Sequence, residues 1–176
     1  MLKLAILSRH RGSKESRMTA FLDWMYHSWQ FSAAATVFAM QMFSSNRPKG
    51  AFKGVDSKER GLILEGVKNT TWDLVYVTEW FTRIRTQAEE NELSVICSRD
   101  FALIRTAELL RQGMLENREP SFLADGFGNK VQERYDKYIR DLENTARALV
   151  PWPKGFASYR RKLVAAMEGE LVGEAG

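Results

Sequence analysis

The sequence predicts an α/β fold that is rich in helices, and two features of the chain lead to this prediction. Residues 2–7 and 93–97 are short apolar runs with the length of buried strands. Elsewhere, apolar residues recur mostly at helical spacing. The run 93–97 also leads directly into a helical pattern, and in an open α/β sheet ligands bind where a strand ends and the next helix exposes its N–H groups. The residues around position 100 are therefore a candidate functional site.

The helices can be predicted one by one from their apolar spacing. The segment 32–43 is apolar nearly all round and follows Ser32, a good N-cap, so we expect it in the core or in a dimer face. Gly61 and Gly66 interrupt the segment 56–67, whereas the segment 70–91 has one clear apolar stripe. The predicted helices are 14–30, 32–43, 56–67, 70–91, 101–113, 129–149 and 155–169, with a loop at 44–50 and a frayed tail through 176.

Length and composition indicate one domain. The chain has 176 residues, a mass of 20.2 kDa and 44% hydrophobic residues, which suffice for a single core. We expect an α/β core over residues 1–113 and a helical extension over residues 114–176 that packs on it. The chain shows neither a signal-like start nor an apolar run of roughly 20 residues, and its single Cys97 suits a reducing compartment. These features predict a cytoplasmic protein that does not bind membranes.

Charge is spread unevenly along the chain. Residues 1–60 carry a net charge of +6, residues 61–128 carry −4, and residues 129–176 carry +2. An acidic centre with basic ends suits a protein that holds a metal ion centrally and contacts phosphates around it. Ordinary solvated helix faces explain the same pattern.

Two short motifs stand out. Asn-Thr-Thr-Trp-Asp at 69–73 opens a predicted helix, and Ser-Arg-Asp at 98–100 ends the second predicted strand. In this order they resemble the PIN-like nucleases over roughly residues 1–112. The resemblance implies a small parallel sheet wrapped by helices, with acidic residues at its carboxyl edge that bind magnesium or manganese. The family's first strand carries an aspartate and residues 2–7 carry none, so a member truncated or degenerate at its N-terminus is expected.

The resemblance implies that Asp73 and Asp100 are the catalytic residues and the metal ligands. In metal-dependent phosphodiester hydrolysis, carboxylates hold an ion that neutralises phosphate charge and positions water. Lys68 and Arg99 lie near these acids in sequence and are the candidate substrate-binding residues, through contacts with phosphate. The resulting prediction is a Mg- or Mn-dependent nuclease, a hydrolase that acts on RNA in preference to DNA.

Each of these residues also has a purely structural explanation. Asp73 completes a capping box with Thr70, and Asp100 precedes a helix as an ordinary N-cap. In the same structural explanation, Lys68 and Arg99 are ordinary charged side chains that face the solvent.

Two other functions remain open at this stage. One is a catalytically silent domain that binds nucleic acid or a protein partner through its basic ends. If such a domain binds nucleic acid, bases could stack on Trp24, Trp72 and Trp80. Packing in the core is the favoured interpretation of these rings. The other is an unrelated helical fold, such as an accessory protein of a phage or mobile element, which applies if residues 2–7 and 93–97 do not pair in one sheet.

Overall fold

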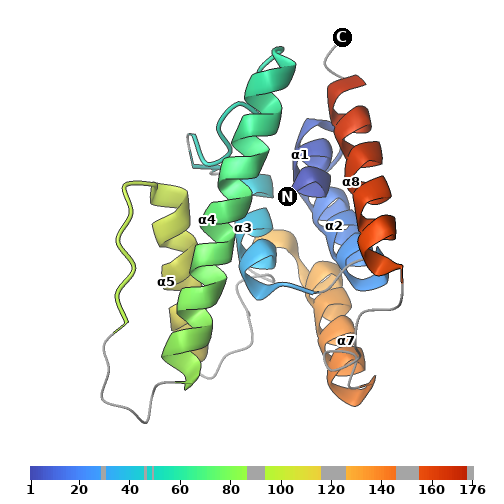
Figure 1. The fold of residues 1–176 in the computed structure, drawn as a ribbon. Helices are drawn as coiled ribbons and strands as arrows, with labels where there is room; N and C mark the ends of the chain where they lie inside the picture. Colours follow the sequence, from blue (N-terminus) through green and yellow to red (C-terminus); the bar gives the residue numbers. More distant parts are fainter. Residues whose placement is uncertain are drawn as a thin grey trace.

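Helices make up the regular secondary structure in the part of the chain that the structure describes (Figure 1). The computed structural model describes residues 1–28, 31–45, 47–48, 50–86, 94–115, 126–145 and 155–173. The helices are α1 (Leu2–Arg9), α2 (Lys14–Ser28), α3 (Ala33–Phe43), α4 (Arg60–Thr86), α5 (Phe101–Leu115), α7 (Asn129–Thr145) and α8 (Phe156–Gly173). Some predicted segments lie partly outside the described residues. These are the ends of three predicted helices, at 29–30, 87–91 and 146–149, the first residue of the second predicted strand, at 93, and the tail after 173.

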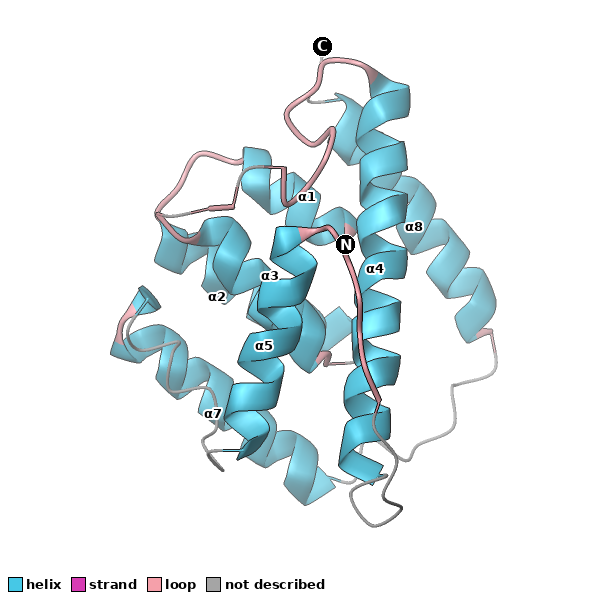
Figure 2. Cartoon of the chain, turned by 90° about the vertical axis from the view of Figure 1, so that its left-hand side faces the viewer, coloured by secondary structure: helices cyan, strands magenta, loops and turns pink. Residues whose placement is uncertain are grey.

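The predicted α/β class is wrong, because neither expected strand forms among the described residues. Residues 2–7 belong to helix α1, in which Leu4 and Ile6 are buried together with their neighbours. A short apolar run that is buried on all sides looks the same in a helix as in a central strand, so periodicity alone misassigned it. Residues 94–97 are extended but pair with no strand, and Figure 2 shows them in a loop that runs alongside α4 and leads into α5. The described part of the chain is all-α, and the small parallel sheet of a PIN-like domain is not supported.

Helix α3 lies at the centre of the molecule. It contacts α1, α2, α4 and α5, and nine of its eleven residues are buried. The hydroxyl oxygen of Ser32 accepts a hydrogen bond from the backbone N–H of Ala35 at 3.2 Å, as expected of an N-cap. Of the two positions expected for the segment 32–43, in the core or in a dimer face, the core is therefore the one observed, and this helix does not offer a free face to a second copy.

The other helices surround α3 in two groups (Figure 1). Helices α4 and α5 pack together on one side of α3. On the other side α2 packs on α7, and α1 packs on both α2 and α8. Among the helices in the described ranges, none combines the length and the apolarity that crossing a membrane requires.

Helix α4 is a single continuous helix through both glycines, where the sequence predicted an interrupted helix and a second one. Gly66 is buried against the turns formed by residues 50–56, and a Cβ atom at Gly66 would overlap the carbonyl group of Lys53. Gly54 has φ +75°, and a Cβ atom there would overlap the carbonyl group of Leu62. The two glycines thus let the turns lie directly on α4, which sets the position of Lys53 beside this helix.

Candidate functional site

Asp100 occupies the N-cap position of α5. Its carboxylate oxygen Oδ1 accepts hydrogen bonds from the backbone N–H groups of Ala102 at 2.9 Å and Leu103 at 3.1 Å. The hydroxyl oxygen of Ser98 accepts a hydrogen bond from the backbone N–H of Asp100 at 3.0 Å. The structural explanation of Asp100 as a helix cap is therefore confirmed.

The loop that carries Asp100 is attached to α4 by a tryptophan. The indole Nε1–H of Trp80 donates a hydrogen bond to the carbonyl oxygen of Ser94 at 3.1 Å. Because this bond joins the start of the loop to α4, it helps to place Asp100 beside the same helix.

Asp73 lies in the middle of α4, so the predicted capping box is wrong. The helix begins at Arg60, well before Thr70. The Thr70 hydroxyl is buried and donates to the carbonyl oxygen of Gly66 at 2.9 Å, one helical turn earlier. The short Thr-x-x-Asp pattern matched a capping box by chance, because nothing local distinguishes it from the interior of a long helix.

The structure does bring Asp73 and Asp100 within electrostatic range of each other. Partial burial of Asp73 raises the pKa of its carboxyl, the negative charge of Asp100 raises it further, and the ammonium of Lys53 acts in the opposite direction. Two charged groups, one at the N-terminus of α5 and one in the turns at 50–56, therefore act on the carboxyl of Asp73 in α4. Sequence reasoning missed Lys53, because only the close packing at Gly66 brings it here.

This pair is an incomplete donor set for a metal ion. Within the described ranges, no group of three or more His, Cys, Asp or Glu side chains is placed to hold one. Asp73 and Asp100 would supply two carboxylates, and Asp100 Oδ1 already accepts two backbone hydrogen bonds. A magnesium ion held by two carboxylates needs water and substrate phosphate for its other ligands.

The two predicted phosphate contacts are both exposed. Lys68 lies five residues before Asp73 on α4, which turns its side chain about 140° around the helix axis from Asp73. Arg99 directly precedes Asp100 in the loop. The helix geometry therefore separates Lys68 from the two acids.

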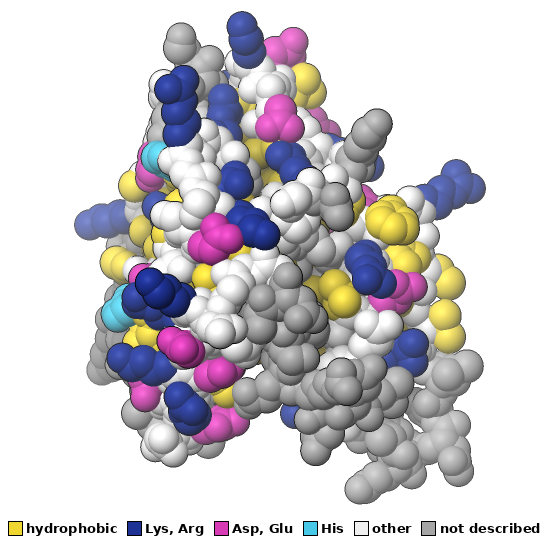
Figure 3. All heavy atoms as spheres, turned by 180° about the vertical axis from the view of Figure 1, so that it is seen from behind, with side chains coloured by type: hydrophobic (Ala, Val, Ile, Leu, Met, Phe, Trp, Pro, Cys, Tyr) yellow, Lys and Arg dark blue, Asp and Glu magenta, His cyan; other side chains and the backbone are white. Residues whose placement is uncertain are grey.

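The most unusual surface of the described residues is apolar. Four of the seven exposed large hydrophobic side chains lie on α4, and two more lie on the loop before α5 and on the first residue of α5. Figure 3 shows the molecule from behind, the side opposite α4; there too, hydrophobic side chains lie among basic and acidic ones toward the edge where α5 lies. The seven residues are Leu62, Trp72, Val75, Tyr76, Val95, Phe101 and Tyr159.

One stripe of α4 gathers three of these side chains between charged residues. Trp72 is 55% exposed and Tyr76 is 63% exposed, and Val75 lies between them in the sequence. At 100° per residue, the stripe spans an arc of about 100° on the side of α4 opposite its buried positions. We call this stripe the α4 face; it consists of Glu65, Lys68, Trp72, Val75, Tyr76, Glu79 and Arg83.

The tryptophans divide between core and surface. Trp24 and Trp80 are partly buried against the hydrophobic core, as the favoured interpretation predicted, whereas Trp72 lies mostly in solvent. The buried stripe of α4 passes through Leu74 and Val77, and Trp72 is turned away from it. Position on a helix, read relative to that stripe, is the signal that would have identified Trp72 as exposed.

Since no sheet forms among the residues that the structure describes, the two motifs behind the PIN-like resemblance are explained by their local positions. The motif at 69–73 lies within α4, and the motif at 98–100 ends in the cap of α5. Comparison of the chain with protein-family models, with curated proteins and with solved structures finds no match.

Proposed function

We propose that this chain is a protein-binding module that binds its partner through the α4 face. The observation that carries this proposal is the cluster of Trp72, Val75 and Tyr76, three adjacent large apolar side chains exposed on one side of a helix. Tryptophan and tyrosine are the residue types that contribute most often to binding energy at protein interfaces. Scattered apolar residues are normal on a surface, but a contiguous group flanked by charges is typical of an interaction site.

The charges of the α4 face favour a protein over a nucleic acid. Lys68 and Arg83 are balanced by Glu65 and Glu79, so the face has no excess of positive charge for a phosphate backbone. Some of the positive charge at the basic ends is paired with acids. The Nζ atom of Lys3 lies 4.0 Å from Oε1 of Glu170, and a guanidinium nitrogen of Arg134 lies 3.1 Å from Oδ1 of Asp23. Binding of RNA through the basic ends, and a cytoplasmic location, remain predictions from the sequence.

The first test removes the two aromatic rings from the α4 face. A protein retained from cell extract on the immobilised chain is purified and titrated against the wild type, the double variant Trp72→Ser/Tyr76→Ser, and Tyr159→Ser. Because paired aromatic residues dominate many interfaces, the double variant should bind at least about 100-fold more weakly. Tyr159 is 50% exposed on α8, so Tyr159→Ser is the matched control and should bind as the wild type does. Equal binding by all three proteins would refute the proposal.

Metal-dependent phosphodiester hydrolysis is the second candidate function, and one observation favours it. Asp73 and Asp100 come from distant parts of the sequence, yet the charge of Asp100 contributes to the raised pKa of Asp73. Two neighbouring carboxylates can bind a magnesium or manganese ion when water and the phosphate of the substrate supply its other ligands. In this reading Asp73 and Asp100 hold the ion and Arg99 contacts phosphate.

The two candidates are separated by calorimetric titration with Mn²⁺ and by a cleavage assay on single-stranded RNA. The protein-binding proposal predicts neither saturable Mn²⁺ binding nor cleavage. The variants are Asp73→Asn/Asp100→Asn, in which asparagine keeps the cap of α5, and the control Glu143→Gln, an exposed acid on α7. Binding and cleavage that are lost together in the first variant and kept in the control would establish the nuclease instead.

A further inference from the structure

The charges of the α4 face would match those of an identical helix that runs in the opposite direction. From the N-terminal end the face carries Glu65 and then Lys68, and toward the other end it carries Glu79 and then Arg83. Each acid is therefore matched by a base at nearly the same distance from the centre of the face, which falls near residues 73 and 74. The apolar side chains of Trp72, Val75 and Tyr76 occupy that centre.

We propose that the partner which covers the α4 face is a second copy of this chain, docked antiparallel about a twofold axis near residues 73 and 74. This inference rests on the proposed function, since both use the α4 face. In the antiparallel arrangement Lys68 of each copy lies opposite Glu79 of the other, and Glu65 lies opposite Arg83. Trp72 packs against Val75 and Tyr76 of the second copy. A twofold axis makes every contact occur twice, as in most dimers of identical chains.

A parallel arrangement of the two helices is disfavoured by the same charges. It would place Glu65, Lys68 and Glu79 each opposite its own copy, and like charges facing each other across an interface are repulsive. Positions 65, 68, 72, 75 and 79 alternate steps of three and four residues, so these side chains lie along one line of the helix surface. The face extends over 18 residue steps, or about 27 Å of helix.

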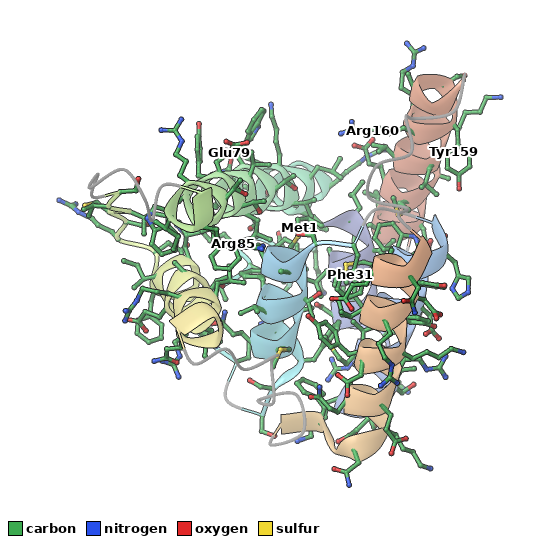
Figure 4. All side chains as sticks on the ribbon, turned by 90° about the horizontal axis from the view of Figure 1, so that it is seen from below. Met1, Phe31, Glu79, Arg85, Tyr159 and Arg160 are labelled. Carbon is green, nitrogen blue, oxygen red and sulfur yellow. The ribbon has the colours of Figure 1, made fainter. Side chains whose placement is uncertain are left out.

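The position of α4 leaves this face accessible to a second helix. Helix α4 packs on α3, α5 and α8, and Figure 4 shows Glu79 pointing away from α3 and α5. Lys68 and Glu79 are both exposed. They lie eleven residues apart on one helix, or about 16 Å along its axis, so they cannot pair with each other within one chain.

Charge reversal at these two positions tests the arrangement by sedimentation equilibrium over a range of about 1 to 200 µM, where a small interface should dissociate. Lys68→Glu places Glu opposite Glu79 twice, and Glu79→Lys places Lys opposite Lys68 twice. Each single variant should raise the dimer dissociation constant at least about tenfold. The control Lys162→Glu reverses an exposed charge on α8 and should dimerise as the wild type does.

Mixing the two single variants gives the decisive result. One chain of Lys68→Glu and one of Glu79→Lys have opposite charges at both contacts, so an equimolar mixture should form a heterodimer of near wild-type strength. The double variant Lys68→Glu/Glu79→Lys should dimerise with itself for the same reason. Thermal melting of each variant checks that the exposed changes leave the fold intact.

Three results would overturn the inference: a wild type that stays monomeric throughout, single variants that dimerise as the wild type does, or a mixture that does not recover. None of these refutes the broader proposal, because a different partner whose binding depends on Trp72 and Tyr76 would still support it. Both proposals would be refuted if no interaction of the chain, with itself or with another protein, depended on Trp72 and Tyr76.

Discussion

The Gly66→Ala variant should lose about 3 kcal/mol of its free energy of unfolding, although alanine is the better helix former. The added Cβ atom would overlap the carbonyl group of Lys53, a backbone group that cannot move without displacing the turns at 50–56. The gain in helix propensity of about 1 kcal/mol does not offset such a displacement. Urea unfolding followed by circular dichroism measures the loss.

Gly61→Ala is the matched control, because it makes the same change in the same helix. A Cβ atom at Gly61 would meet no atom within 4 Å, so this variant should gain up to about 1 kcal/mol. Displacing Lys53 in Gly66→Ala should also raise the pKa of Asp73 further, since Lys53 opposes the effects of burial and of Asp100. Stabilisation by both substitutions would show that the turns do not lie on α4 as described.

Tyr138→Ala should be comparably damaging, with an expected loss of about 4 kcal/mol. Tyr138 is 3% exposed, and its ring stacks on Tyr26 with centroids 4.0 Å apart and an angle of 7° between the planes. Its hydroxyl donates a hydrogen bond to Asp23 Oδ1 at 2.6 Å, which joins α7 to α2. Removing the ring therefore opens a cavity at the contact between these helices.

Tyr138→Phe separates the hydrogen bond from the packing. It keeps the stacked ring and removes the hydroxyl, so the expected loss is about 1 kcal/mol. The Arg134–Asp23 pair remains in that variant, but both of its side chains are substantially exposed and the pair contributes little. A loss below about 1 kcal/mol in Tyr138→Ala would contradict the packing of α7 on α2.

Much of the helical content follows from local sequence. The predicted helices 14–30, 32–43 and 101–113 correspond to α2, α3 and α5, because each has apolar residues at helical spacing or a clear cap. Residues 2–7 were predicted as a strand but form part of helix α1, because a short and almost fully apolar run has no periodicity that distinguishes a helix from a strand. The interruption predicted at Gly66 is wrong for another reason. A glycine is needed there because residues 50–56 pack on the helix, and the local sequence does not indicate this contact.

The candidate site could be predicted only in part. The two acids were identified, and Asp100 as a helix cap was among the alternatives, because N-caps depend on local sequence. The contribution of Lys53 and the exposure of Trp72 depend on tertiary packing. Tyr76, the most exposed aromatic side chain of α4, was not among the candidates, although its distance from the buried stripe of Leu74 and Val77 would have marked it.

Hydroxyl-radical footprinting of the free and the bound chain tests most directly whether a partner covers the α4 face. The free chain should show Trp72 and Tyr76 as reactive, in line with their exposure, together with Phe101 and Tyr159. In the complex, with a second copy or with another protein, the account predicts protection of Trp72 and Tyr76 and unchanged reactivity of Phe101 and Tyr159. Protection of Phe101 or Tyr159 with Trp72 and Tyr76 still reactive would contradict it.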